Sequence, residues 1–398
     1  MKKFYTLLVA VLTISATAFA NDGESLATKN EGNAVQTTQD ATLADKVANL
    51  EVRLAKAEKR AANWEKVKQY LKISGFAQGA YDWTDEDYSS TFHLRRARIS
   101  ISGDLYKGKK GAKLDYRFYF DLARLTKKAP MLDMWIRYQP FKEFGVQVGQ
   151  FKNPFTMEAS IGPNKYDFID YSYAVCNLAK MGSNDVLGLD ITARDLGFQF
   201  FGGFIHKKGF SVINYNLAVL NGSGINTKDN NKSKDIMARL TIKPLKELSI
   251  ATYYQWGEAV WEKAVDYGWT GNTNYVTTHR WGGGVNYDAK SFFVRGEYIG
   301  GLSANLHSWG AYVSGGYRIY ADKMPGCAWI GAMVDYYRYD VNVKKTDMRY
   351  MLCVGYEPIK YFRAQVGYSL EQRIGDGYIF KSNRPFRNTI KVLLTASF

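Results

Sequence analysis

Arginines are the side chains whose spacing in this sequence best suits a chemical task. Arg96 and Arg98 occupy alternate positions, and Ser100 and Ser102 continue the same face. A guanidinium group offers a planar fork that matches the oxygens of phosphate, sulfate or carboxylate. Several such groups along a wall of low dielectric constant concentrate anions and repel cations. The pattern therefore predicts a surface that guides anions.

Further arginines fall on the polar side of alternating segments by the same parity. With the first two they form the set Arg96, Arg98, Arg117, Arg137, Arg239, Arg295, Arg349 and Arg363. A second interpretation stays open, in which nearby acids pair with these arginines and only stiffen the protein. The acids in question are Asp115, Asp121, Asp133, Asp335 and Glu371. Arg95 breaks the parity, and we expect it near the outer rim.

Residue types that serve nucleophilic or metal chemistry are few and scattered. They are His93, His206, His279 and His307, and Cys176, Cys327 and Cys353. The cysteines lack the spacing of a metal site, and we expect them to be free. The sequence contains no P-loop, no H-E-x-x-H and no G-x-S-x-G motif. We therefore expect no enzyme, no cofactor and no metal site.

The segments that carry the arginines alternate with a period of two from Leu71 onward, which is typical of β-strands. In residues 113–122, Leu, Tyr and Phe occupy one face while Lys, Asp and Arg lie mainly on the other. We predict about sixteen strands, beginning near Leu71, Phe92, Ala112, Met131, Phe144, Asp195, Gly209, Asp235, Glu247, His279, Ser291, Ser308, Cys327, Asp347, Tyr361 and Asn388.

Three observations favour a membrane barrel over a soluble sandwich. Aromatic residues make up 15% of the chain and gather near strand ends, as in the interfacial girdles of barrels. Tight turns alternate with longer polar loops. The last alternating segment ends on Phe398, as outer-membrane barrels do. We therefore predict an all-β fold, with residues 71–398 forming a 16-stranded antiparallel transmembrane β-barrel. A barrel of that size leaves an aqueous channel.

The inward direction of the arginines follows from the membrane. An arginine that faces lipid at the midplane costs about 2–4 kcal/mol. We therefore expect the arginine set to line the pore.

The first twenty residues have the features of a secretory signal peptide. Lys2 and Lys3 precede an apolar run, and Ala18-Phe19-Ala20 supplies a cleavage site. We expect residues 21–40, which are polar and rich in small residues, to form a disordered linker. Export argues against nucleic acid as the partner of this basic chain, whose formal net charge is +15. An acidic membrane surface or a small anion fits that charge better.

Residues 41–70 show a heptad pattern of about four repeats. One interpretation is a short periplasmic coiled coil that ties subunits together. The other is a single amphipathic helix against the barrel rim, since Ala57 and Ala61 weaken the seam.

Residues 152–194 are far longer than a hairpin needs. We expect this segment to fold into the barrel and narrow the pore, with Phe155, Lys165, Asp167 and Asp170 at the constriction. A lid or an outer surface loop is the alternative.

Several stretches resemble the phosphate-selective porin O/P family. They are Phe92–Gly103, Val148–Glu158, Ala193–Gly197 and Leu217–Gly222. With the strand layout the resemblance extends over nearly the whole chain after Leu71. It implies a sixteen-stranded trimeric channel in which arginines guide phosphate-like anions to a lysine-bearing constriction. Arg96, Arg98 and Lys152 are the positions that match. The long loop departs from the family by having few lysines and several acids.

Taken together, the sequence predicts an outer-membrane porin of a Gram-negative bacterium that allows passive diffusion of small solutes with an anion preference. Its expected partners are outer-membrane lipid and small anions such as phosphate. We expect a homotrimer. The alternatives are a general non-selective porin and a barrel-anchored structural or adhesive protein.

Overall fold

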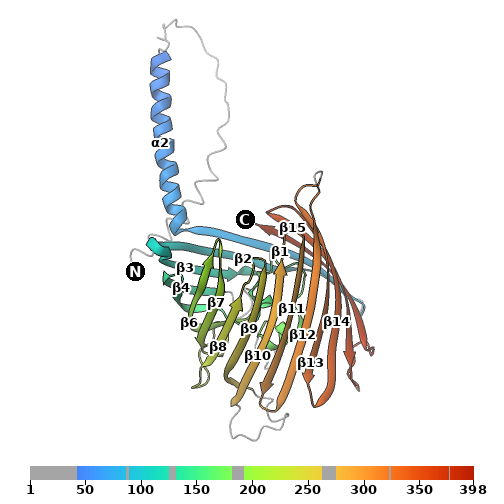
Figure 1. Ribbon diagram of the computed structural model, residues 1–398. Coiled ribbons are helices and arrows are strands. Elements are labelled where there is room, and N and C mark those ends of the chain that lie inside the picture. The colour runs from blue at the N-terminus through green and yellow to red at the C-terminus, as the bar shows by residue number, and fades with distance from the viewer. Residues whose placement is uncertain are drawn as a thin grey trace. The chain divides into compact units, whose positions relative to one another are not determined.

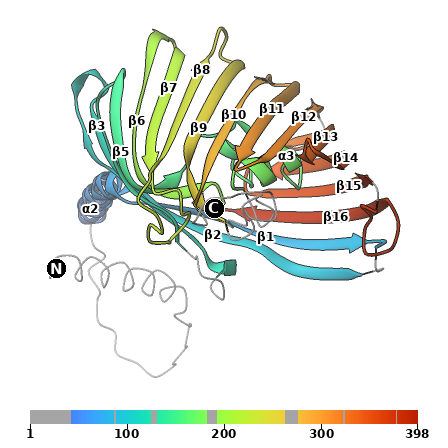
Figure 2. The same cartoon turned by 90° about the horizontal axis from the view of Figure 1, so that it is seen from below.

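A closed antiparallel barrel is the main body of the protein. The computed structural model describes residues 43–86, 89–124, 131–181, 192–261, 275–321, 324–375 and 377–398. Within these residues, sixteen strands each pair with their neighbours in sequence, and β1 pairs with β16 to close the ring. Figure 1 shows the strands side by side, and Figure 2 shows β1 beside β16. The predicted barrel is confirmed.

The strands have the following bounds: β1 Lys72–Thr84, β2 Ser90–Lys107, β3 Lys113–Asp121, β4 Met131–Phe141, β5 Phe144–Lys152, β6 Arg194–Lys207, β7 Phe210–Leu220, β8 Asp235–Ile242, β9 Leu248–Val260, β10 Tyr275–Asp288, β11 Phe292–Ser303, β12 Leu306–Ile319, β13 Cys327–Asp340, β14 Val343–Ile359, β15 Phe362–Ile374 and β16 Phe386–Ser397. Strands β10 and β14 begin earlier than the sequence indicated, because Tyr275–Thr278 and Val343–Thr346 pair although their polarity does not alternate cleanly.

The two ends of the barrel differ in their connections. The start of β1, the end of β16 and seven short connections lie at one end, which we call the short-turn end; the opposite end is the long-loop end. The expected alternation of tight turns and long loops holds only in part. Two connections at the long-loop end are also tight, with only residues 304–305 between β11 and β12 and residues 341–342 between β13 and β14.

The strands separate apolar from polar side chains as the alternation predicts. On β8, Ile236, Leu240 and Ile242 are exposed on the outside, whereas Asp235 and Met237 are buried inside. Outward aromatic side chains cluster in contacting groups, including a stacked pair of Trp309 and Tyr336. Apolar side chains exposed over a whole outer surface suit lipid and not water.

The lumen contains the segment between β5 and β6. Its described part, residues 153–181, includes the short helix α3 (Tyr173–Leu178), which lies against β11, β12 and β13 inside the ring (Figure 2). Inward glycines make room for it: a Cβ atom at Gly310 would lie 2.8 Å from the Cβ atom of Ala174. Phe155, Phe168 and Leu178 are fully buried in one apolar cluster with inward wall residues.

A helix precedes the barrel in the chain. Helix α2 covers Leu43–Tyr70, within the predicted 41–70. By compactness the chain divides into two units, Met1–Ala61 and Ala62–Phe398. No helix among the described residues is both long enough and apolar enough to span a membrane. The coiled coil stays a prediction, and the predicted signal peptide (1–20) and linker (21–40) lie outside the described residues.

The separation of faces predicts a difference between adjacent positions of β7. Leu217 is exposed on the outside, while Asn216 lies inside and is half-buried. Leu217→Arg should lower the free energy of unfolding in lipid vesicles by about 2–4 kcal/mol, because it places a guanidinium in lipid. Denaturant titrations of Leu217→Arg and of a control variant, Asn216→Arg, measure the effect. Asn216→Arg is the control and should cost much less; equal losses would contradict a lipid-facing outer surface.

Candidate functional site

The lumen-facing arginines divide into two groups by their partners. Six of the predicted cations contact a carboxylate. Their pairs, nitrogen to oxygen, are Arg98–Asp121 (2.9 Å), Arg117–Asp133 (3.5 Å), Arg137–Asp115 (2.6 Å), Arg295–Asp167 (2.8 Å), Arg349–Asp335 (2.8 Å) and Arg363–Glu357 (2.9 Å). The charge is locally neutralised at these six positions. In four of the pairs the acid is one that the second interpretation named, whereas Arg295 and Arg363 pair with Asp167 and Glu357, which it did not name. Glu371, another acid named from the sequence, pairs with Arg387 instead.

Three predicted cations have no carboxylate partner in the described part of the chain. Arg96 donates to Gln78 Oε1 at 2.9 Å. Arg239 donates to the backbone oxygen of Thr156 at 3.0 Å and to Ser160 Oγ at 2.8 Å. The side chain of Lys152, at the end of β5, makes no hydrogen bond or ion pair with described residues. The uncompensated positive charge of the predicted set is therefore concentrated at these three positions.

Arg96 and Lys152 belong to one electropositive region of the wall. Arg96, Arg98 and Arg194 all act on Lys152 electrostatically, and of the neighbouring acids Asp133 opposes them. Arg98 and Arg194 each bind a carboxylate, at 2.9 and 2.6 Å. Two guanidinium groups are thus held in place by acids, whereas Arg96 and Lys152 have no carboxylate partner among the described residues.

The expected position of Arg95 near the outer rim is wrong. It contacts Asp170 Oδ1 at 2.6 Å and the backbone oxygen of Ile169 at 3.1 Å, so it lies in the lumen against the inner segment. The register between β1 and β2 shifts between Gln78 and Gly79, which leaves Arg95 unpaired as a β-bulge. A bulge lets two successive side chains point to the same side. In the sequence, the break in parity at Arg95 is the trace of this bulge.

Charged wall residues hold the inner segment at several points. Asp167 contacts Arg295 at 2.8 Å and Arg318 at 3.4 Å. Arg349 donates to the backbone oxygen of Tyr171 at 2.6 Å. Lys180 pairs with Asp235 at 3.0 Å. Two arginines predicted to guide anions, Arg295 and Arg349, are only 5% exposed and instead fix this segment to the wall.

The four residues predicted for the constriction differ in their surroundings. Phe155 is buried against the ring of Tyr253, and Asp167 is buried between arginines. Asp170 lies between Arg95 and Lys391. Burial by itself raises the pKa of Asp170, but these two cations outweigh it and hold that pKa well below its usual range. Lys165 differs from the other three because its side chain is exposed.

A pair of buried carboxylates, which the sequence did not single out, fastens the start of the inner segment. Glu297 on β11 accepts the backbone N–H groups of Met157 and Glu158, each at 2.6 Å, and the hydroxyl groups of Tyr253 and Tyr312. Glu158 accepts from Tyr166 Oη and from the amide and hydroxyl of Ser172. The polar face of β11 marked Glu297 only as inward-facing.

The closed ring of sixteen strands, its apolar outer face and its charged lumen define the protein as an outer-membrane porin. A family model described as phosphate-selective porin O and P matches residues 67–291, more than half of the chain. The chain belongs to this family.

Solved porin structures share the fold at low sequence identity. An anion-selective porin from Comamonas acidovorans has 8% identity and a TM-score of 0.61, covering 82% of this chain and 99% of its own. OmpT of Vibrio cholerae in its trimer form has 13% identity and a TM-score of 0.57, with the same coverage. OprB of Pseudomonas putida has 9% identity and a TM-score of 0.61, covering 85% and 96%. No curated protein matches the chain.

The contacts of Glu297 generate a first prediction for the inner segment. Glu297→Gln replaces one acceptor oxygen by an amide that faces donors, so residues 155–160 should open more readily. A hydrogen bond to a charged group contributes about 1.5–3 kcal/mol, which corresponds to an amide exchange about 10–100 times faster. Hydrogen exchange read by mass spectrometry measures it. Glu258→Gln, at a side chain that makes no hydrogen bond or ion pair with the described residues, should leave the exchange unchanged; faster exchange there as well would argue against a specific role of Glu297.

The environment of Glu158 generates a prediction for pH. The pKa of Glu158 is raised to about 7, because burial and the charge of Glu297 together outweigh the hydrogen bonds from Tyr166 and Ser172, which lower it. A carboxyl group whose pKa is higher in the folded state stabilises that state at low pH and loses this contribution as the pH rises through the folded pKa.

The local opening free energy of residues 153–181 should therefore fall between pH 5 and pH 8. Hydrogen exchange corrected for the intrinsic pH dependence of amide exchange measures it. Glu158→Gln should make the profile flat over this interval, and an unchanged slope in that variant would assign the dependence to another group.

Proposed function

We propose that this porin passes small solutes by passive diffusion with a preference for anions, phosphate-like anions among them, and that it has no catalytic role. The observation that carries the proposal is that, among the residues that the structure describes, no carboxylate pairs with Arg96 or Lys152. A permeating anion meets a net positive field where these side chains lie, and a cation is repelled there.

The acids of the inner segment do not oppose this preference. Asp167 is bound by Arg295 and Arg318, and Asp170 by Arg95 and Lys391. Each acid has two cationic neighbours, so neither presents an unopposed negative charge to the lumen. The acidic composition that separates this segment from the family pattern is therefore compatible with anion passage.

A general non-selective porin is the second candidate. Six of the predicted guiding cations are paired with carboxylates, which supports a wall of alternating charge and little selectivity. The two candidates differ in the sign and size of the reversal potential under a salt gradient.

We also propose how the protein sits and assembles. Export by a signal peptide and barrel insertion would leave the short-turn end, with helix α2, on the periplasmic side. A homotrimer with a coiled coil of α2 agrees with the heptad pattern, and the Vibrio cholerae porin with the same fold is described in a trimer form.

Reversal potentials in planar bilayers test the proposal. Under a potassium chloride gradient the protein should show an anion preference, and the double variant Arg96→Gln, Lys152→Gln should move the reversal potential toward zero while keeping an open channel. Arg137→Gln is the control, and it removes half as much charge as the double variant. It is suitable because Lys113 also contacts Asp115, at 2.9 Å, and keeps that carboxylate compensated when Arg137 is lost. A cation preference of the unmodified protein would overturn the proposal.

A further inference from the structure

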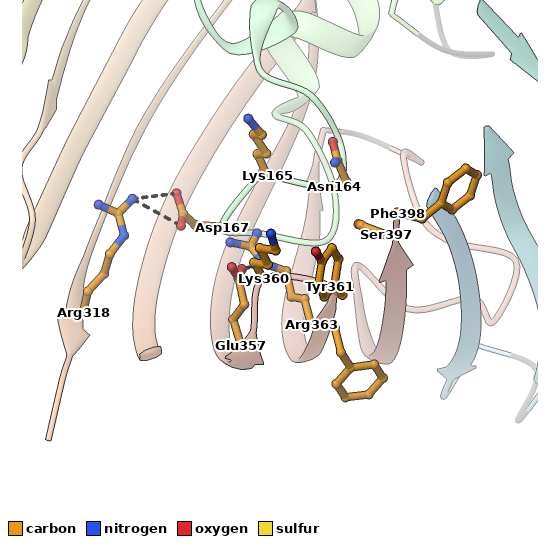
Figure 3. A pocket seen from close by; sticks show the side chains of 11 residues that line it. Asn164, Lys165, Asp167, Arg318, Glu357, Lys360, Tyr361, Arg363, Ser397 and Phe398 are labelled. Carbon is orange, nitrogen blue, oxygen red and sulfur yellow. Dashed lines mark hydrogen bonds and ion pairs between the residues drawn. The ribbon is translucent and has the colours of Figure 1, made fainter. Parts of the chain in front are cut away.

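A cavity of about 480 Å³ lies at the short-turn end of the barrel, between the inner segment and the wall. Asn164, Lys165 and Asp167 form its inner side. The opposite side comes from β12, from β14 to β16 and from the turn between β14 and β15 (Figure 3). The wall residues are Arg318, Glu357, Lys360, Tyr361, Phe362, Arg363, Ser397 and Phe398. Strands distant in sequence thus meet the tip of the inner segment around one space.

The inner side of the cavity is held rigidly. Asp167 is clamped by Arg295 and Arg318, as described above. The backbone oxygen of Asp167 accepts the indole N–H of Trp329 at 3.0 Å, and that of Tyr166 accepts from Arg363 at 3.0 Å. The residues immediately after Lys165 are therefore fixed by side chains of the wall, which sets the position of Lys165 at the edge of the cavity.

The cavity is positively charged. Four cationic and two anionic side chains line it. Both acids have guanidinium partners: Asp167 binds Arg318 and Arg295, and Glu357 binds Arg363 at 2.9 Å. Lys165 and Lys360 are exposed and have no carboxylate partner within the described residues, and the ammonium of Lys360 lies over the ring of Tyr361. Two ammonium groups from separate elements are thus available to a ligand.

The size and the remaining polar groups indicate what that ligand is. A volume of 480 Å³ is in the range of sites for small organic molecules. Lysine binds phosphate as a point charge, and a phosphate monoester carries about −1.5 to −2 at neutral pH. The amide of Asn164, the hydroxyl of Ser397 and the carboxylate of Glu357 can hydrogen-bond hydroxyl groups.

We infer that this cavity is a binding site for a small phosphate monoester with a hydroxylated body, such as a sugar phosphate, with Lys165 and Lys360 as ligands of the phosphate group. The site is separate from the positive region of Arg96 and Lys152. Delivery of the ligand through the lumen rests on the proposed function, but binding from the short-turn end does not.

Calorimetry with glucose 6-phosphate on the folded protein in detergent tests the site. The unmodified protein should bind it. The affinity of the double variant Lys165→Gln, Lys360→Gln should be lower by a factor of about ten or more, as expected for the loss of charge-assisted contacts. The control Lys208→Gln, Lys246→Gln removes the same charge from exposed turn lysines at the same end, outside the cavity. It should retain the affinity.

Three outcomes overturn the inference. They are no heat with the unmodified protein, equal affinity in both double variants, and binding of inorganic phosphate as tight as that of glucose 6-phosphate. In planar bilayers, glucose 6-phosphate added at the short-turn end should reduce the chloride current of the unmodified protein and not that of the Lys165, Lys360 variant. Calorimetric binding without any channel current would contradict the proposed function and leave this site standing.

Discussion

Closure of the barrel forces each strand to give one face to lipid and the other to the lumen, and the rest of the structure depends on this constraint. At the depth of the hydrocarbon, a charged group of the wall must lie inside, because lipid offers it no partner. Acids and bases from all around the ring then share one narrow space. Most of them satisfy one another, as Arg349 and Asp335 do at 2.8 Å, and the inner segment is held by charges of the same wall.

The alternating sequence contained most of the fold. The period of two predicted the strands, their number and the inward direction of the arginines, because strand parity and the cost of a charge in lipid are local properties. Some pairs follow once the strand register is known: Arg98 lies opposite Asp121, and Arg349 opposite Asp335. The register itself is not local, so the sequence left pairing and guiding as two open interpretations.

Other parts of the site depend on the path of the chain through the lumen. Asp167 and Arg295 are 128 residues apart in the sequence, and nothing local predicts that they form an ion pair. Only the course of residues 153–181 through the lumen brings the two side chains within 2.8 Å. Glu297 is one acid among several on inward faces until the backbone of Met157 reaches it. The inward position of Arg95 requires the bulge opposite Gln78 and Gly79, which the sequence marks only as a break in parity and which does not by itself give the direction of the side chain.

Pairing also decides which charges a solute can sense. A buried arginine held by a carboxylate contributes to structure, since separating the pair would leave an unsolvated charge, whereas an unpaired cation on the lumen surface projects its field into the water.

The unpaired cations do not form a continuous column. Arg96 and Lys152 lie on β2 and β5, and Lys165 and Lys360 lie at the short-turn end, with paired groups such as Arg98 and Asp121 elsewhere on the wall. Passage through a channel requires binding that is favourable enough for entry and weak enough for release, and separate sites meet both needs better than one deep site. Under the proposed anion preference, neutralising most of the arginines serves conduction, because a wall with every guanidinium unpaired would retain the anions it attracts.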